Sequence, residues 1–96
     1  MLFDTNFPED ITIEEGVRLT SGVKIVTHFM NPKEKRYDRG KVHICKGAYI
    51  GMGSLIVKPV TIGEYAVVGA GSVVTKDIPP REVWAGNPVR FIKKIE

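Results

Sequence analysis

Three side chains of this sequence could carry proton transfer or nucleophilic attack near neutral pH: His28, His43 and Cys45. A histidine titrates near about pH 6.5, so it can accept a proton from a hydroxyl group as that hydroxyl attacks an electrophile. His28 directly precedes a charged, turn-rich segment of the kind that projects beside binding sites. From the residues alone, we expect it to be a surface histidine whose side chain points outward. We expect His43 to pack at the end of that segment or to face solvent. Cys45 has no base near it in the sequence, which disfavours a covalent intermediate on its sulfur.

The cysteine content bears on redox and metal chemistry. One cysteine cannot form an internal disulfide, and Cys45 has no partner at the spacings typical of zinc sites. We therefore expect no disulfide and no metal in the functional site.

The N-terminal sequence and the apolar runs bear on cellular location. No stretch of about 18 apolar residues is present, so no membrane-spanning helix is expected. The first residues, MLFDTNFPED, carry acids where a signal peptide would be basic and then apolar. The sequence thus predicts a cytoplasmic protein.

The basic residues are concentrated after the N-terminal segment. Residues 1–17 contain five acids and neither lysine nor arginine, so the rest of the chain carries all 14 basic residues against six acids. A basic surface of this kind suits nucleic acid, an anionic surface or a phosphorylated small molecule. Because the sequence has no nucleic-acid-binding motif and few aromatic residues that could stack on bases, we expect no nucleic-acid partner.

The elements that must position these side chains follow from a repeat of six residues. Branched aliphatic residues recur in one phase on both sides of a single interruption: Ile13, Leu19, Ile25, Ile44, Ile50, Ile56, Ile62, Val68 and Val74. Four places after each of them stands a small or apolar residue, which makes a second inward column: Val17, Val23, Phe29, Ala48, Ser54, Val60, Ala66, Ser72 and Ile78. The residue before each member of the second column is glycine in five of nine cases, as tight corners require. His28 takes one of these corner positions.

The repeat predicts an all-β protein. A period of six matches neither a helical turn nor a heptad, and β-branched residues favour strands. Short strands joined by corners stack into a parallel β-helix whose aliphatic columns fill a narrow interior. With three hexads in each coil, residues 1–96 form a single domain. Its parts are a partial first coil (1–12), three coils (13–30, 44–61 and 62–79), a projecting loop (31–43) and a C-terminal extension (80–96).

Three segments, together with the repeats, make the sequence similar to a known family. They are VTHFMNP before the loop, GAGSVVTKDIPP in the last coil and WAGNPVRFIKKI at the C-terminus. In this conjunction they resemble the hexapeptide-repeat acyltransferases, and among those the galactoside, maltose and polysaccharide O-acetyltransferases. The resemblance implies a left-handed β-helix, a homotrimer, and acetyl-CoA as acyl donor between neighbouring subunits. Oligomerisation also agrees with the size of the chain, because so small a domain buries a limited core.

The resemblance further implies roles for single residues. His28 matches the catalytic histidine of these enzymes, and acceptor contacts fall on Asn6 and Tyr49. Asn6 loosely matches an upstream asparagine, and Tyr49 stands where many relatives have tryptophan. The acetyl-CoA contacts fall on a small-residue run and on three bases: Gly69, Ala70, Gly71, Ser72, Lys76, Arg90 and Lys93. Family members usually run nearly twice this length.

The expected reaction is direct acetyl transfer to a sugar or glycan hydroxyl, with His28 as a general base that contributes roughly 10²–10⁴-fold in rate. Two alternatives remain open. One is N-acetylation of an amino-sugar or other amine, which invites an additional acidic group near the site. The other is a non-catalytic β-helix that assembles or regulates, which would not bind CoA and would be indifferent to the loss of His28.

Overall fold

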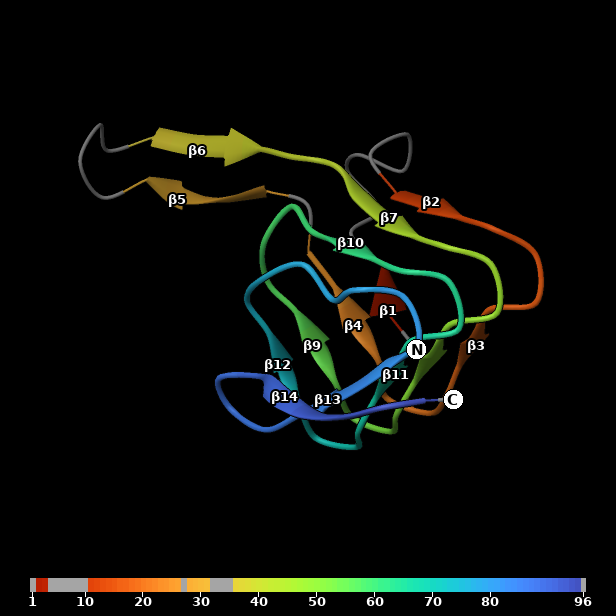
Figure 1. Ribbon diagram of the computed structural model, residues 1–96. Helices are drawn as coiled ribbons and strands as arrows, with labels where there is room; N and C mark the ends of the chain where they lie inside the picture. The colour runs from red at the N-terminus through yellow and green to blue at the C-terminus, as the bar shows by residue number, and fades with distance from the viewer. Residues whose placement is uncertain (1, 4–10, 27, 32–35, 96) are drawn as a thin grey trace.

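The computed structural model describes residues 2–3, 11–26, 28–31 and 36–95, and all regular structure within them is β-strand (Figure 1). The strands are β1 (Leu2–Phe3), β2 (Ile11–Ile13), β3 (Arg18–Leu19), β4 (Lys24–Ile25), β5 (His28–Asn31), β6 (Arg36–Arg39), β7 (Val42–Ile44), β8 (Tyr49–Ile50), β9 (Leu55–Ile56), β10 (Thr61–Ile62), β11 (Val67–Val68), β12 (Val73–Val74), β13 (Glu82–Ala85) and β14 (Arg90–Lys94). Among these described residues, no helix has the length and apolar character needed to cross a bilayer.

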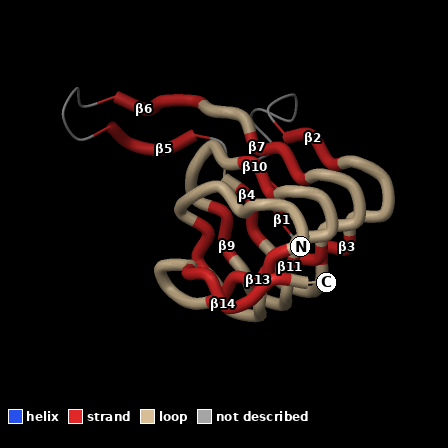
Figure 2. The backbone as a smooth tube through the Cα atoms, in the orientation of Figure 1, coloured by secondary structure: helices blue, strands red, loops and turns tan. Residues whose placement is uncertain are grey.

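Short parallel strands form three walls that wind around one axis, with turns between them (Figure 2). Wall 1 contains β2, β7 and β10; wall 2 contains β3, β8, β11 and β13; wall 3 contains β1, β4, β9 and β12. Ile13 pairs with Ile44, and Ile44 pairs with Ile62, so residues of the same hexad phase lie directly above one another. The predicted all-β fold, a left-handed parallel β-helix, is confirmed.

The interior is filled by the two columns that the repeat predicts. In the aliphatic column, every residue from Ile25 to Val74 is at most 1% exposed. In the second column, the members from Ala48 to Ile78 are at most 4% exposed, and Val23 in the coil before them is at 0%. Full burial of an aliphatic side chain contributes roughly 1.5–3 kcal/mol, so this stacking stabilises a small domain. Ile13 remains 39% exposed, because β2 is the last strand of wall 1 and no strand of the described chain pairs with its outer edge.

The corners between walls depend on left-handed backbone conformations. Gly71 has a φ of 70°, and the space where its Cβ would lie is open. At Gly47, with a φ of 72°, a Cβ would lie 2.3 Å from the ring of Tyr65 in the next coil. Tyr65 itself has a φ of 57°, and Arg81 lies over its ring at 5.0 Å. This corner therefore needs glycine both for its backbone conformation and for the packing of the tyrosine above it.

The insertion begins earlier than expected and contains regular structure. The strands β5 and β6 pair antiparallel as a hairpin that projects from the solenoid, with His28 opposite Arg39 (Figure 1). The expectation that His28 occupies a corner, that Phe29 continues the inward column and that 31–43 is a loop is therefore corrected. Antiparallel pairing satisfies backbone polar groups that leave the wall. Val42, which the loop was expected to include, is fully buried in wall 1.

The chain returns from the hairpin through Gly40. A Cβ on this residue would lie 2.4 Å from Cβ of Pro59, so only glycine fits against that corner without displacing it. After Gly40 the chain enters β7, which pairs with β2 and β10 in wall 1.

The C-terminal extension, predicted from residue 80, packs on the end of the solenoid. β13 adds to wall 2 in parallel, with Trp84 above Val68, and Ile78 forms a parallel bridge with Ile62. β14 then turns back antiparallel on β13. Trp84 packs against the core and meets the ring of Phe91 edge-on at 6.0 Å. These residues cover the C-terminal end of the apolar interior.

Candidate functional site

His28 lies where the hairpin leaves the solenoid. Its backbone starts β5 directly after wall 3, and the return strand leads through Gly40 into wall 1. The residue thus belongs to a projecting element anchored on two walls. Asn6, the other predicted acceptor contact near the N-terminus, lies outside the described residues.

Tyr49 lies on a different wall from either anchor of the hairpin. It belongs to β8 in wall 2, between Arg18 and Val67, and is 40% exposed. Within one chain, the topology therefore does not place Tyr49 beside His28. Its outward position leaves the side chain available to a neighbouring molecule.

The predicted small-residue run forms the corner between β11 and β12. A Cβ on Gly69 would lie 2.8 Å from Cβ of Ala85, and Gly71 has the left-handed conformation described above. Ala70 is exposed at the outer edge of this corner. The requirements of the solenoid therefore explain both glycines, and the corner also presents an accessible backbone.

Ser72 is buried at the same corner, and its hydroxyl is already engaged. Ser72 Oγ donates a hydrogen bond to the carbonyl of Gly69 at 2.6 Å and accepts one from the backbone N–H of Gly86 at 3.1 Å. The buried hydroxyl of Ser54 donates to the same carbonyl at 3.1 Å. Ser72 therefore links this corner to Gly86, Ser54 links it to the coil before, and the two buried hydroxyls hold the corner from inside.

The three predicted basic residues are all exposed. Lys76 Nζ lies 5.9 Å from the centroid of the Trp84 ring, at the end of the solenoid that β13 and β14 cover. Arg90 and Lys93 both belong to β14, opposite Ala85 and Val83. Lys76 and strand β14 therefore both lie beside β13, which contains Trp84. Together, Lys76, Arg90 and Lys93 place three exposed positive charges at this end of the molecule.

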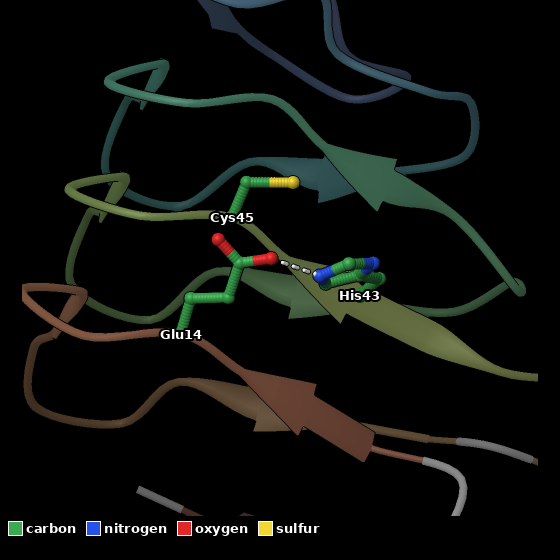
Figure 3. A group of neighbouring side chains, drawn as sticks. All are labelled: Glu14, His43 and Cys45. Carbon is green, nitrogen blue, oxygen red and sulfur yellow. Dashed lines mark hydrogen bonds and ion pairs between the residues drawn. The ribbon is translucent and has the colours of Figure 1, made fainter.

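The structure also assembles a group of side chains that the sequence analysis missed. Glu14, His43 and Cys45 converge on the outer side of wall 1 (Figure 3), and their nearest ligand atoms all lie within 4.8 Å of one another. Glu14 Oε2 and His43 Nε2 share a hydrogen bond of 2.5 Å, and the backbone N–H of Lys46 donates to Glu14 Oε1 at 2.9 Å. The signal was present in the repeat, because Glu14 and Cys45 directly follow the stacked residues Ile13 and Ile44.

Electrostatics differ between the two acidic members of this group. Hydrogen bonds from His43 and from the Lys46 backbone hold the pKa of Glu14 below its ordinary value. Burial raises the pKa of the Cys45 thiol, and the negative charges of Glu14 and Glu64 raise it further. A protonated thiol is a poor nucleophile, which agrees with the expectation that no covalent intermediate forms on Cys45.

Known transferases share the repeat and the fold of this chain. The sequence profile described as "Bacterial transferase hexapeptide (six repeats)" matches residues 41–76. The structure is similar to a maltose O-acetyltransferase from Clostridium difficile 630, with a TM-score of 0.84 and 43% identity over 90% of this chain and 49% of that one. It is also similar to a galactoside acetyltransferase solved in complex with coenzyme A, with a TM-score of 0.84 and 35% identity over 90% of this chain and 46% of that one.

Sequence relatives include an enzyme that acts on an amino-sugar nucleotide. The dTDP-3-amino-3,6-dideoxy-alpha-D-galactopyranose 3-N-acetyltransferase of Aneurinibacillus thermoaerophilus is 56% identical over 52 residues, which cover 54% of this chain and 27% of that protein. A relative from Schizosaccharomyces pombe is 41% identical over 90% of this chain, and one from Staphylococcus aureus is 41% identical over 78% of it. The chain spans only 44% and 39% of their lengths. Repeat, fold and profile agree, and the chain belongs to the hexapeptide-repeat family of transferases.

Proposed function

We propose that this chain forms the catalytic solenoid of an acetyl-CoA-dependent O-acetyltransferase that modifies a hydroxyl group of a sugar or glycan. The observation that supports this most is its likeness to the maltose O-acetyltransferase, because 43% identity extends over 90% of the chain. The cytoplasmic location stays a prediction from the N-terminal sequence.

In the proposed reaction, His28 is the general base. Its imidazole takes the proton of the acceptor hydroxyl as the oxygen attacks the thioester carbonyl carbon. When the carbon–sulfur bond breaks, the imidazolium returns that proton to the departing sulfur, so the histidine ends the cycle neutral. General-base assistance of this kind contributes roughly 10²–10⁴-fold in rate.

The C-terminal end of the solenoid fits the donor. The small residues Gly69, Ala70, Gly71 and Ser72 form a corner that is exposed at Ala70 and Gly71, so a pantetheine arm can lie along its outer edge. Lys76, Arg90 and Lys93 supply positive charges for phosphate groups. The hydrogen bonds of the Ser72 hydroxyl to Gly69 and Gly86 hold this corner in place.

A homotrimer would complete the site. In the single chain, the exposed large apolar side chains include Tyr49, Met52, Phe91 and Ile92, which are 40–63% exposed. Packing three copies wall against wall would cover such surface and bring wall 2 of one copy towards the hairpin of the next. Tyr49 would then contact the acceptor beside His28 of a neighbouring subunit.

Titration calorimetry with acetyl-CoA, combined with a mass measurement on the same sample, tests the donor site and the trimer. We expect one binding site per subunit in a particle of about 32 kDa, three times the chain mass of 10.7 kDa. Replacement of both Arg90 and Lys93 by glutamine should weaken binding, whereas replacement of Lys24, an exposed base on β4, should not. A well-folded trimer without affinity for acetyl-CoA would favour the non-catalytic alternative.

N-acetylation of an amino-sugar is the second candidate, because the relative from Aneurinibacillus thermoaerophilus carries that activity in its name. Paired acceptors that differ only in a hydroxyl or an amino group at one carbon separate the two reactions. Preference for the hydroxyl acceptor supports the proposal. Preference for the amine, with activity rising as the ammonium group loses its proton, would replace it.

A further inference from the structure

We propose that Glu14, His43 and Cys45 form a binding site for a divalent ion of the zinc class on the outer side of wall 1. This site is separate from acetyl transfer and departs from the sequence-based expectation that the protein binds no metal.

The strand register brings the three donors together. His43 and Cys45 flank the inward-facing Ile44, so both point outward from the same stretch of chain. Glu14 follows Ile13 in the adjacent strand, where Ile13 is paired with Ile44. Two neighbouring coils therefore present a carboxylate, an imidazole and a thiol to one point in space (Figure 3).

The distances are close to those that a single ion requires. Zinc binds sulfur at about 2.3 Å and nitrogen or oxygen at about 2.0–2.2 Å, so ligand atoms of one tetrahedral ion lie roughly 3.2–3.7 Å apart. Here all three pairs are within 4.8 Å, and the Glu14–His43 pair is at 2.5 Å. Both of these side chains are partly exposed, at 37% and 43%, so side-chain rotation alone can open the pair around an ion.

The donor set selects the kind of ion. Sulfur and imidazole nitrogen favour zinc over magnesium or calcium, which prefer oxygen ligands. Three protein ligands leave a fourth tetrahedral position for water.

The surroundings of Glu14 prepare it to act as a ligand. The Lys46 backbone N–H holds Oε1 and leaves Oε2 directed at His43. An outer hydrogen bond of this kind orients a ligating carboxylate. The ammonium group of Lys46 forms an ion pair with the carboxylate of Glu15 at 3.6 Å, rather than with that of Glu14. The neighbouring Glu64 adds negative charge that favours a cation at this position.

The direct test is calorimetric titration of the metal-free chain with Zn²⁺, with Mg²⁺ as a second probe. We expect one Zn²⁺ per chain and no binding of Mg²⁺. Loss of a residue that hydrogen-bonds a metal ligand typically weakens metal binding about 10–100-fold. Loss of a ligand itself should therefore reduce Zn²⁺ affinity by at least that factor in each of the variants Glu14→Gln, His43→Gln and Cys45→Ser. Matched controls are Glu15→Gln and His28→Gln, which remove the neighbouring carboxylate and the other histidine and should leave Zn²⁺ affinity unchanged.

Substitution with Co²⁺ provides a second readout that does not depend on affinity. A cobalt–thiolate bond absorbs in the near ultraviolet through charge transfer, so wild type and Glu15→Gln should show this band and Cys45→Ser should lack it. Circular dichroism verifies that each variant retains the strand signal of wild type. The proposal is overturned by the absence of Zn²⁺ binding, by affinity that survives all three ligand substitutions, or by one ion per three chains, which would mean a site shared by the three copies of the proposed trimer.

Discussion

At the scale of single residues, the same side-chain type has different consequences depending on its place in the coil. Gly71 and Gly47 share the left-handed conformation, but only Gly47 lies beneath an aromatic ring. Glu14 and Glu15 are adjacent, yet only Glu14 is held by hydrogen bonds from His43 and Lys46. These matched pairs make the contribution of each environment measurable.

Replacement of Gly71 by alanine tests the conformational requirement alone. A non-glycine residue in the left-handed region costs about 1–2 kcal/mol, and nothing surrounds the added methyl group. Gly47→Ala should reduce the free energy of unfolding by more, because the methyl group also displaces the ring of Tyr65. Chemical denaturation of the two variants gives the comparison. Equal losses would show that the ring moves aside freely.

The ionisation of Glu14 should depend on His43. The folded-state pKa of Glu14 is lowered, with the bond from His43 as the largest cause, so this interaction stabilises the protein above the unfolded pKa and is lost as pH falls through the folded one. In His43→Ala, the pKa of Glu14 should rise towards its ordinary value. Carboxyl chemical shifts followed by nuclear magnetic resonance measure the change, and Glu15 serves as the internal control. An unchanged Glu14 titration would contradict the observed pairing.

At the scale of elements, most strands that stack in the three walls contribute only two or three residues, so stability comes from stacking rather than from any strand alone. Ile25, Ile56 and Val74 occupy successive coils of wall 3 and are at most 1% exposed. A defect in the middle of such a column affects the coils on both sides. The hairpin β5–β6 differs, because it pairs within itself and leaves the stack.

Ile56→Asp should therefore prevent folding. An unpaired carboxylate in this fully buried position has no hydrogen-bond partner and no room for water. Ile56→Val, which shortens the same side chain, should cost only about 0.5–1.5 kcal/mol. Lys58→Asp introduces the same acid at an exposed position two residues away and should remain folded. Circular dichroism and size-exclusion chromatography distinguish these results, and a folded Ile56→Asp protein would mean that the inward phase is wrong.

At the scale of the whole molecule, the predicted site residues lie in three different parts of the solenoid. The small-residue corner and the exposed bases lie towards the C-terminal end of the solenoid, whereas the hairpin that carries His28 leaves between walls 3 and 1. Tyr49 lies on wall 2. An active site that uses all of them needs contributions from neighbouring copies, which is why oligomeric state and catalysis are tested together.

Loss of the proposed base should separate assembly from chemistry. In His28→Ala, we expect an intact trimer and undiminished affinity for acetyl-CoA, while the rate of transfer falls by about 10²–10⁴-fold. Sedimentation analysis, calorimetry and a thiol-release assay measure the three properties on one preparation. His43→Ala is the matched control and should retain activity. Equal turnover by wild type and His28→Ala would remove His28 from the catalytic role.

The six-residue period by itself determined the fold class, the two inward columns and most of the corners. These features are local, because aliphatic, small and glycine residues recur at fixed spacing and each requires a particular face or backbone conformation. The burial of Ile50, Ser54 and Val68 follows directly from that phase. The continuation of wall 2 through Trp84 was missed, because the phase shifts after Val74.

Only the tertiary structure decided what meets across the insertion. Glu14 and His43 are 29 residues apart, and their contact exists because β2 and β7 stack in register after the hairpin has left the wall. Hydrogen bonding between coils and the fit of Gly40 against Pro59 set that register, and neither is visible in a local pattern. The same reasoning explains His28, whose position in the repeat predicts a corner although antiparallel pairing with Arg39 places it at the start of a hairpin.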